Sequence, residues 1–122
     1  MKKQPDVLIV DDEREICFLL AAFLKQMGYN VDCAYSLQEG AEKLTSHEGF
    51  DIVFLDLNLP DGLGYKLIPE IKHQNNEAHV VMISAHDSTL QRIKNETNDI
   101  SQYLSKPFSR DHIASVLSQL AT

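Results

Sequence analysis

The chain reads IVFLD over residues 52–56, and this stretch decides the fold. Four consecutive apolar side chains are typical of a strand that is buried on both of its faces. Gly49 interrupts the chain just before the run, and Asp56 stands at its far end. We therefore predict the strongest strand over residues 51–55, with a carboxylate placed directly after it.

Shorter apolar runs flank this strand in both directions along the chain. They predict further strands at residues 7–10, 30–34, 79–84 and 101–105. Amphipathic stretches alternate with these runs and predict helices between the strands. This alternation implies a parallel sheet covered by helices on both faces, and right-handed crossovers restrict it to a doubly wound α/β sandwich.

Two of the predicted helices differ in the strength of their apolar pattern. The first ends at Gly28, which suits a left-handed cap, and its apolar residues recur at helical spacing: Ile16, Leu19, Leu20, Phe23, Leu24 and Met27. By contrast, Leu90 and Ile93 predict only a poorly apolar helix before the last strand.

Capping residues and one proline set the limits of the other helices. Residues 36–39 have the S-x-x-E form of a capping box. Ser109 is placed to cap the last helix, whose apolar face is Ile113, Val116, Leu117 and Leu120. Pro69 is disruptive beyond a first helical turn, so the helix expected within residues 65–72 should start late, near Leu67, or bend.

The composition of the chain bounds its class. With 122 residues and 43% apolar residues, residues 1–122 are expected to form a single domain. The net charge of −7 and the lack of a basic run argue against direct nucleic-acid binding, and no apolar stretch is long enough to span a membrane. Residues 1–6 lack an apolar signal core, and Cys17 and Cys33 are interpreted as reduced, buried thiols, so we expect a cytoplasmic protein.

Three acids and one lysine follow predicted strands at the point where each strand ends. Asp11 and Asp12 follow residues 7–10, Asp56 follows the central strand, and Lys106 follows residues 101–105. Open α/β sheets bind ligands at the carboxyl edge, where these groups are expected to converge. Crowded carboxylates call for a cation, and the nearby lysine suggests that a more strongly anionic group also arrives.

Each of these residues also has a simpler interpretation when it is considered alone. Asp11 and Asp12 could cap the first helix and complement its dipole. Asp56 could be a turn former before Pro60, and Lys106 a solvated surface lysine. The combination of all four favours a binding site over these separate explanations.

With these residues in place, the chain resembles a known family, the receiver domain of two-component response regulators, over about residues 5–120. That family has a flavodoxin-like five-stranded sheet in the order 2-1-3-4-5. The resemblance rests on chemically distinctive residues at the strand ends, in order: Asp11-Asp12, Asp56, Ser84, Tyr103 and Lys106-Pro107.

The resemblance implies a phosphoacceptor and a metal ion. Asp56 would accept a phosphoryl group from the phosphohistidine of a histidine kinase or a phosphotransfer protein. Mg²⁺ would be held by Asp12, Asp56 and the backbone carbonyl of Asn58, with Asp11 acting through water. Lys106 would pair with a phosphoryl oxygen.

The resemblance also implies a conformational switch. The Ser84 hydroxyl would be drawn towards the phosphoryl group, and Tyr103 would turn from exposed to buried. The surface formed by the helix around residues 90–93, the strand 101–105 and the last helix would then be remodelled for a partner. His86, just after the site, could influence loss of the phosphoryl group or be an exposed loop residue; Tyr103, considered alone, could be an ordinary packing residue.

The chain departs from the family in places. Leu59-Pro60 replaces a common Met-Pro, and Ser84 replaces the more frequent threonine. Asp99-Ile100 replaces a common Gly-Ala. The glycine usually suits a special backbone conformation, which aspartate can adopt at some cost, and Ile100 is larger than alanine. We expect the preceding helix to be shifted, shortened or mobile as a result.

The function predicted from sequence is a signalling switch in a two-component system or phosphorelay, which catalyses only its own phosphorylation and dephosphorylation. One alternative is a phosphatase of the haloacid dehalogenase type, although Asn58 stands where that class has its second acid. Another is a receiver-like interaction domain that is not regulated by phosphorylation. The chain could be a stand-alone regulator or the receiver of a longer protein.

Overall fold

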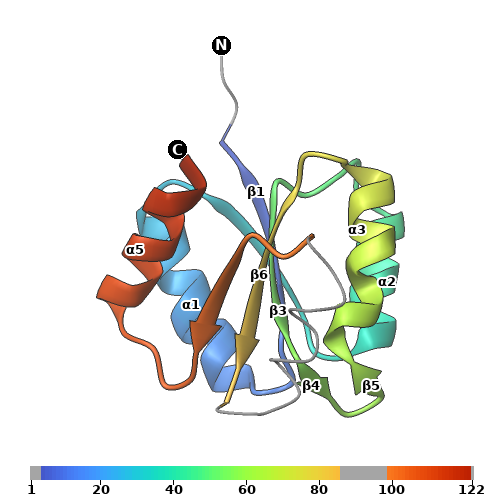
Figure 1. Ribbon diagram of the computed structural model, residues 1–122, viewed down its shortest axis with the longest axis horizontal. Helices are drawn as coiled ribbons and strands as arrows, with labels where there is room; N and C mark the ends of the chain where they lie inside the picture. The colour runs from blue at the N-terminus through green and yellow to red at the C-terminus, as the bar shows by residue number, and fades with distance from the viewer. Residues whose placement is uncertain (1–3, 86–98, 122) are drawn as a thin grey trace.

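The computed structural model describes residues 4–85 and 99–121. Within them, one main sheet has five parallel strands in the order β2-β1-β3-β6-β7 (Figure 1). These strands are β1 (Asp6–Val10), β2 (Asn30–Ala34), β3 (Ile52–Asp56), β6 (His79–Ser84) and β7 (Gln102–Ser105). Counted within the sheet, this is the predicted order 2-1-3-4-5. The prediction is therefore confirmed.

Helices cover both faces of the sheet, as the alternating pattern predicts. Helices α1 (Arg14–Gln26) and α5 (Arg110–Ala121) pack on one face, and α2 (Leu37–Thr45) and α3 (Ile68–Gln74) pack on the other (Figure 1). The helix predicted around Leu90 and Ile93 lies outside the described residues. No helix in the described part of the chain is long and apolar enough to cross a membrane.

The central strand is buried on both faces, which accounts for its unbroken apolar run. Val53 and Leu55 belong to the core cluster under α2 and α3. Phe54 belongs to the cluster under α1 and α5. Because successive side chains of a strand point to opposite faces, this strand supplies both cores at once.

The helix limits follow the capping residues. Gly28 has a φ of 96°, the left-handed conformation expected of it. The Glu39 amide donates to Ser36 Oγ at 3.1 Å, while the Glu39 carboxylate accepts from the Tyr35 amide, one residue earlier than a capping box requires. At the last helix, the His112 amide donates to Ser109 Oγ at 3.2 Å.

Pro69 lies in the first turn of α3, where its missing amide hydrogen removes no helical bond. A short 3₁₀ helix, η1 (Gly64–Leu67), precedes it, so the late start predicted near Leu67 is confirmed. A separate hairpin of β4 (Asn58–Leu59) and β5 (Gly62–Leu63) follows Asp56.

Not every apolar residue of the α1 pattern faces the sheet. Leu19 and Met27 are 43% and 42% exposed, because the face of α1 that meets the sheet is set by Cys17, Leu20 and Leu24. Asp99 is exposed at the start of the described segment 99–121. The preceding helix, expected to be altered, lies outside the described residues; Ile100 packs against the core.

The two cysteines are free thiols on facing elements, α1 and β2. Cys17 is buried, as expected, and its thiol donates to the backbone oxygen of Asp11 at 3.3 Å. Cys33 is only half-buried, which corrects the expectation of two buried thiols. The reason is that β2 is an edge strand of the main sheet and is less covered than β1 and β3.

Candidate functional site

Three carboxylates meet at the carboxyl edge of the main sheet. Asp11 directly follows β1, Asp12 comes next, and Asp56 ends the adjacent strand β3. One oxygen from each lies within 4.8 Å of the others. Asp11 and Asp56 are only 0% and 5% exposed, so two like charges are held close together with little water to screen them.

Lys106 directly follows the edge strand β7 and brings a positive charge to the same carboxyl edge. Its backbone amide donates to the Ser84 carbonyl at 2.8 Å, which continues the pairing of β6 and β7. Its Nζ lies 2.9 Å from Asp11 Oδ2 and 3.5 Å from Asp56 Oδ2. The lysine and the three acids, predicted to converge from their positions after strands, are therefore neighbours in space.

Glu13 is a member of the cluster that sequence reasoning missed. Lys106 Nζ lies 2.7 Å from Glu13 Oε1, which is its shortest ion pair, and the Glu13 side chain is 59% exposed. The Glu13 amide also donates to Asp11 Oδ1 at 2.9 Å. The available signal was its place as the third consecutive acid after β1, but residue type alone does not separate it from an ordinary surface acid.

The pKa values of Asp56 and Lys106 are both raised, for different reasons. Burial, followed by the charge of Asp11, raises the pKa of Asp56 to about 7, although Lys106 and the hydrogen-bonded Asn58 amide act in the opposite direction. Burial alone would lower the pKa of Lys106, but its hydrogen bond to Glu13 and its close pairing with the Asp11 carboxylate outweigh burial and raise that pKa above its usual value. Lys106 is therefore positively charged at neutral pH.

The donor set fits a hard divalent cation. Asp11 Oδ2 is buried and has no hydrogen-bond partner among the described residues; its contact with the Lys106 ammonium is an ion pair without hydrogen-bond geometry. A buried oxygen in that condition is costly unless a further charge compensates it. Three carboxylates supply the oxygen ligands that Mg²⁺ prefers. The ligand role predicted for the Asn58 backbone carbonyl remains a prediction; Asn58 itself is exposed in β4.

Gly64 is a second residue that sequence reasoning missed. A Cβ atom at this position would lie 1.9 Å from the backbone oxygen of Asp56. The Gly64 amide also donates to the Leu57 carbonyl at 2.7 Å. Only glycine allows η1 to approach the backbone of the site this closely, and no local sequence signal reveals a contact between two separate segments.

The predicted switch residues lie on adjacent strands. Ser84 is buried at the end of β6, and Tyr103 is half-buried in the middle of β7, where burial raises the pKa of its phenol. Tyr103 also lines a cavity of about 400 Å³ with Pro107 and residues of α5. His86, the predicted modulator, lies outside the described residues.

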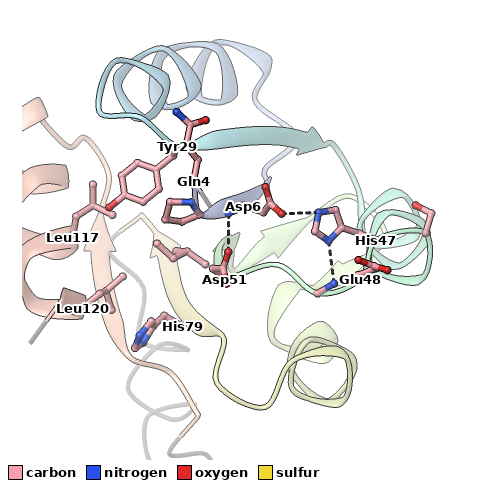
Figure 2. A pocket seen from close by; sticks show the side chains of 13 residues that line it. Gln4, Asp6, Tyr29, His47, Glu48, Asp51, His79, Leu117 and Leu120 are labelled. Carbon is pink, nitrogen blue, oxygen red and sulfur yellow. Dashed lines mark hydrogen bonds and ion pairs between the residues drawn. The ribbon is translucent and has the colours of Figure 1, made fainter. Parts of the chain in front are cut away.

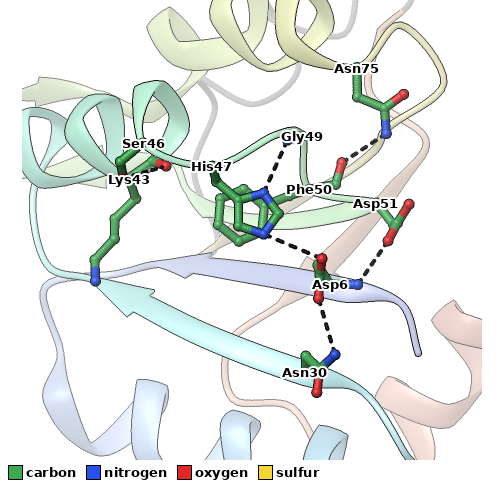
Figure 3. Close-up of polar contacts among 9 residues, drawn as sticks. All are labelled: Asp6, Asn30, Lys43, Ser46, His47, Gly49, Phe50, Asp51 and Asn75. Atoms are coloured by element: carbon green, nitrogen blue, oxygen red, sulfur yellow. Dashed lines mark hydrogen bonds and ion pairs between the residues drawn. The ribbon is translucent and has the colours of Figure 1, made fainter. Parts of the chain in front are cut away.

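A larger cavity, of about 770 Å³, lies at the opposite edge of the sheet (Figure 2). Two of its acidic groups, Asp6 and Asp51, are engaged within the fold (Figure 3): Asp6 Oδ2 lies 3.3 Å from His47 Nε2, and Asp6 Oδ1 accepts from Asn30. Asp51 Oδ2 accepts from the Asp6 amide at 2.8 Å. These bonds give the carboxylates a structural role, and the carboxyl edge remains the candidate site.

The sequence matches the response regulator receiver domain family over residues 7–118, and the chain belongs to that family. Receiver domains are in general signalling domains that bind Mg²⁺ at an acidic pocket, and the group of Asp11, Asp12 and Asp56 forms such a pocket here.

Solved structures have the same fold. A CheY-like receiver domain protein from Methanospirillum hungatei JF-1 is 24% identical, with a TM-score of 0.84 and coverage of 98% of this chain and 95% of that one. The chemotaxis response regulator CheY4 of Vibrio cholerae is 22% identical, with a TM-score of 0.85 and coverage of 97% and 99%. NtrX from Brucella abortus is 30% identical, with a TM-score of 0.82; the match covers 98% of this chain and 27% of that one.

Proposed function

We propose that this receiver domain is a phosphoacceptor switch whose acceptor is Asp56. The donor is the phosphohistidine of a histidine kinase or of a phosphotransfer protein. The observation that carries the proposal is a buried carboxylate flanked by a second acid, with the Lys106 ammonium 3.5 Å from its Oδ2. Phosphoryl transfer needs positioning and charge stabilisation, and this arrangement offers both.

The chemistry is a transfer between two nucleophiles. A carboxylate oxygen of Asp56 forms a bond to phosphorus while the phosphorus–nitrogen bond of the donor breaks, and the bonding electron pair leaves with the imidazole nitrogen. Hydrolysis later returns the Asp56 carboxylate as leaving group. Mg²⁺, when held by Asp12, Asp56 and the backbone carbonyl of Asn58, with Asp11 acting through water, would supply positive charge that offsets the repulsion between the carboxylates and the incoming phosphoryl oxygens.

Lys106 and Ser84 stabilise the phosphorylated form of Asp56. The ammonium of Lys106 already pairs with Asp56 and can transfer that pairing to a phosphoryl oxygen. The Ser84 hydroxyl, at the end of the neighbouring strand, donates to another. This second bond exists only in the phosphorylated state, so it can shift a conformational equilibrium towards that state.

The readout is a change at β7 and α5. Tyr103 lies on the strand next to Ser84 and lines the cavity between β7 and α5. Inward movement of Ser84 allows the Tyr103 ring to become more buried, which changes the surface presented to a partner or an effector domain. Protection of Tyr103 and the α5 amides should therefore differ between the two states.

The test is chemical phosphorylation. The protein is incubated with Mg²⁺ and acetyl phosphate and then weighed by mass spectrometry. We expect a gain of one phosphoryl group that is absent in Asp56→Asn and retained in Asp32→Asn, a matched change on the exposed edge strand β2. A gain that persists in Asp56→Asn, or no gain in the parent protein, would contradict the proposal. Sustained turnover of a phosphate ester, well above self-dephosphorylation, would instead support a phosphatase.

A further inference from the structure

The Lys106 ammonium is shared among three carboxylates, and the partners are not equivalent. Its distances are 2.7 Å to Glu13, 2.9 Å to Asp11 and 3.5 Å to Asp56. Asp11 and Asp56 are buried members of the metal-binding group. Glu13 lies outside that group and is 59% exposed, so the shortest contact of the lysine is to the one acid that is free to move into solvent.

We propose that Glu13 is a positioning residue that holds the Lys106 ammonium at the rim of the site. An ammonium and a divalent cation compete for the carboxylates of Asp11 and Asp56. By binding the ammonium, Glu13 reduces its occupancy of those carboxylates and leaves them available to Mg²⁺. Because the Glu13 carboxylate is exposed, it can release Lys106 at small cost once a more strongly charged phosphoryl group is present.

This arrangement predicts two effects of opposite sign when the Glu13 charge is removed. Without Glu13, the ammonium stays on Asp11 and Asp56, so Mg²⁺ binds about two- to fivefold more weakly, the range expected for one exposed ion pair. Once Mg²⁺ saturates the site, Lys106 has no competing partner, so an anion at Asp56 binds tighter by about the same factor. A general disruption of the site would weaken both ligands.

The first experiment titrates Mg²⁺ alone by calorimetry into four proteins: the parent, Glu13→Gln, Lys106→Met and the double variant. We expect Glu13→Gln to weaken Mg²⁺ binding in the parent and to have no effect in the Lys106→Met background, because the two residues act as one unit. Glu15→Gln, which removes the same charge from the first turn of α1, should leave the affinity unchanged. An equal loss in both backgrounds, or no loss in the parent, overturns the inference.

The second experiment titrates trifluoroberyllate, an analogue of the phosphoryl group, at saturating Mg²⁺ and follows it by ¹⁹F NMR. This step rests on the proposed function, whereas the Mg²⁺ titration does not. Tighter binding in Glu13→Gln than in the parent supports the inference, and weaker or equal binding overturns it. If the parent binds no trifluoroberyllate, the proposed function fails, and the Mg²⁺ cycle still decides the role of Glu13.

Discussion

Asp56 is held in a setting that disfavours its own charge. Its pKa rises from 3.8 to about 7, chiefly because the carboxyl group is buried and secondly because Asp11 lies beside it. Between these two values the folded protein binds a proton that the unfolded chain has lost. The free energy of unfolding therefore falls as the pH rises through this window, and the full cost is present above it.

Replacement of the acceptor should reveal that cost. Asp56→Asn removes the buried charge, so we expect the free energy of unfolding to rise by roughly 1 to 3 kcal/mol at about pH 8 and to change little at about pH 4. Urea unfolding in Mg²⁺-free buffer at both pH values measures the difference. A gain of the same size at both pH values would show that the charge is not its origin.

At the scale of elements, two contacts link the β4–β5 hairpin, and η1 directly after it, to neighbouring elements. Asp61 accepts from the amides of Leu37 and Gln38, at 2.8 and 3.1 Å, and thereby caps α2 from a separate segment. Gly64 lies against the backbone of Asp56. The hairpin and η1 together therefore connect the start of α2 to the strand that carries the acceptor.

Asp61 should contribute to stability through this cap. The backbone hydrogen bond from Leu37 is the main reason that the pKa of Asp61 lies below its usual value, so the contribution is present above that usual value and lost as the pH falls through the lower one. We expect Asp61→Ala to lower Tm and to speed hydrogen exchange at the Leu37 and Gln38 amides, with Asp61→Asn intermediate. Unchanged exchange at both amides would argue against a capping role.

A side chain at Gly64 should disturb both the fold and the site. Gly64→Ala places a Cβ in the space of the Asp56 carbonyl, and we expect a loss of about 1 to 3 kcal/mol together with weaker Mg²⁺ binding. Gly28→Ala is the matched control, because that glycine has a positive φ but no atom within 4 Å of an added Cβ. It should lower stability and leave Mg²⁺ affinity unchanged. Equal Mg²⁺ affinities in the two variants would contradict this explanation.

For the whole molecule, the sequence predicted the features that depend on the order and direction of the strands. The apolar run of β3 identifies a strand buried on both faces, and the resemblance implies the strand order. Because the strands are parallel, their carboxyl ends meet at one edge, and Asp11, Asp56 and Lys106 converge there. Side-chain partnerships were not predictable in this way. Glu13, Gly64 and Asp61 act through contacts between distant segments, and the exposure of Leu19 depends on how α1 is rotated against the sheet.

Metal binding should be visible in global stability. Because the proton and Mg²⁺ compete for Asp56, we expect Mg²⁺ to raise Tm more at about pH 8 than at about pH 5. At a concentration a hundred times its Kd, a ligand specific for the folded state stabilises it by about 2.7 kcal/mol. Thermal scans with Mg²⁺ and with chelator measure the effect, which Asp12→Asn should reduce. A Tm shift independent of pH would contradict competition at Asp56.

The bond from the Lys106 amide to the Ser84 carbonyl has a consequence for how the site tolerates sequence change. The bond joins the backbones that carry the ammonium and the hydroxyl, so the spacing of those two backbone positions is set by main-chain geometry that every residue type shares. Surrounding loops can then diverge without altering that spacing. Because the two backbones are bonded, a shift of the β6 end towards the site also changes the position from which Lys106 extends.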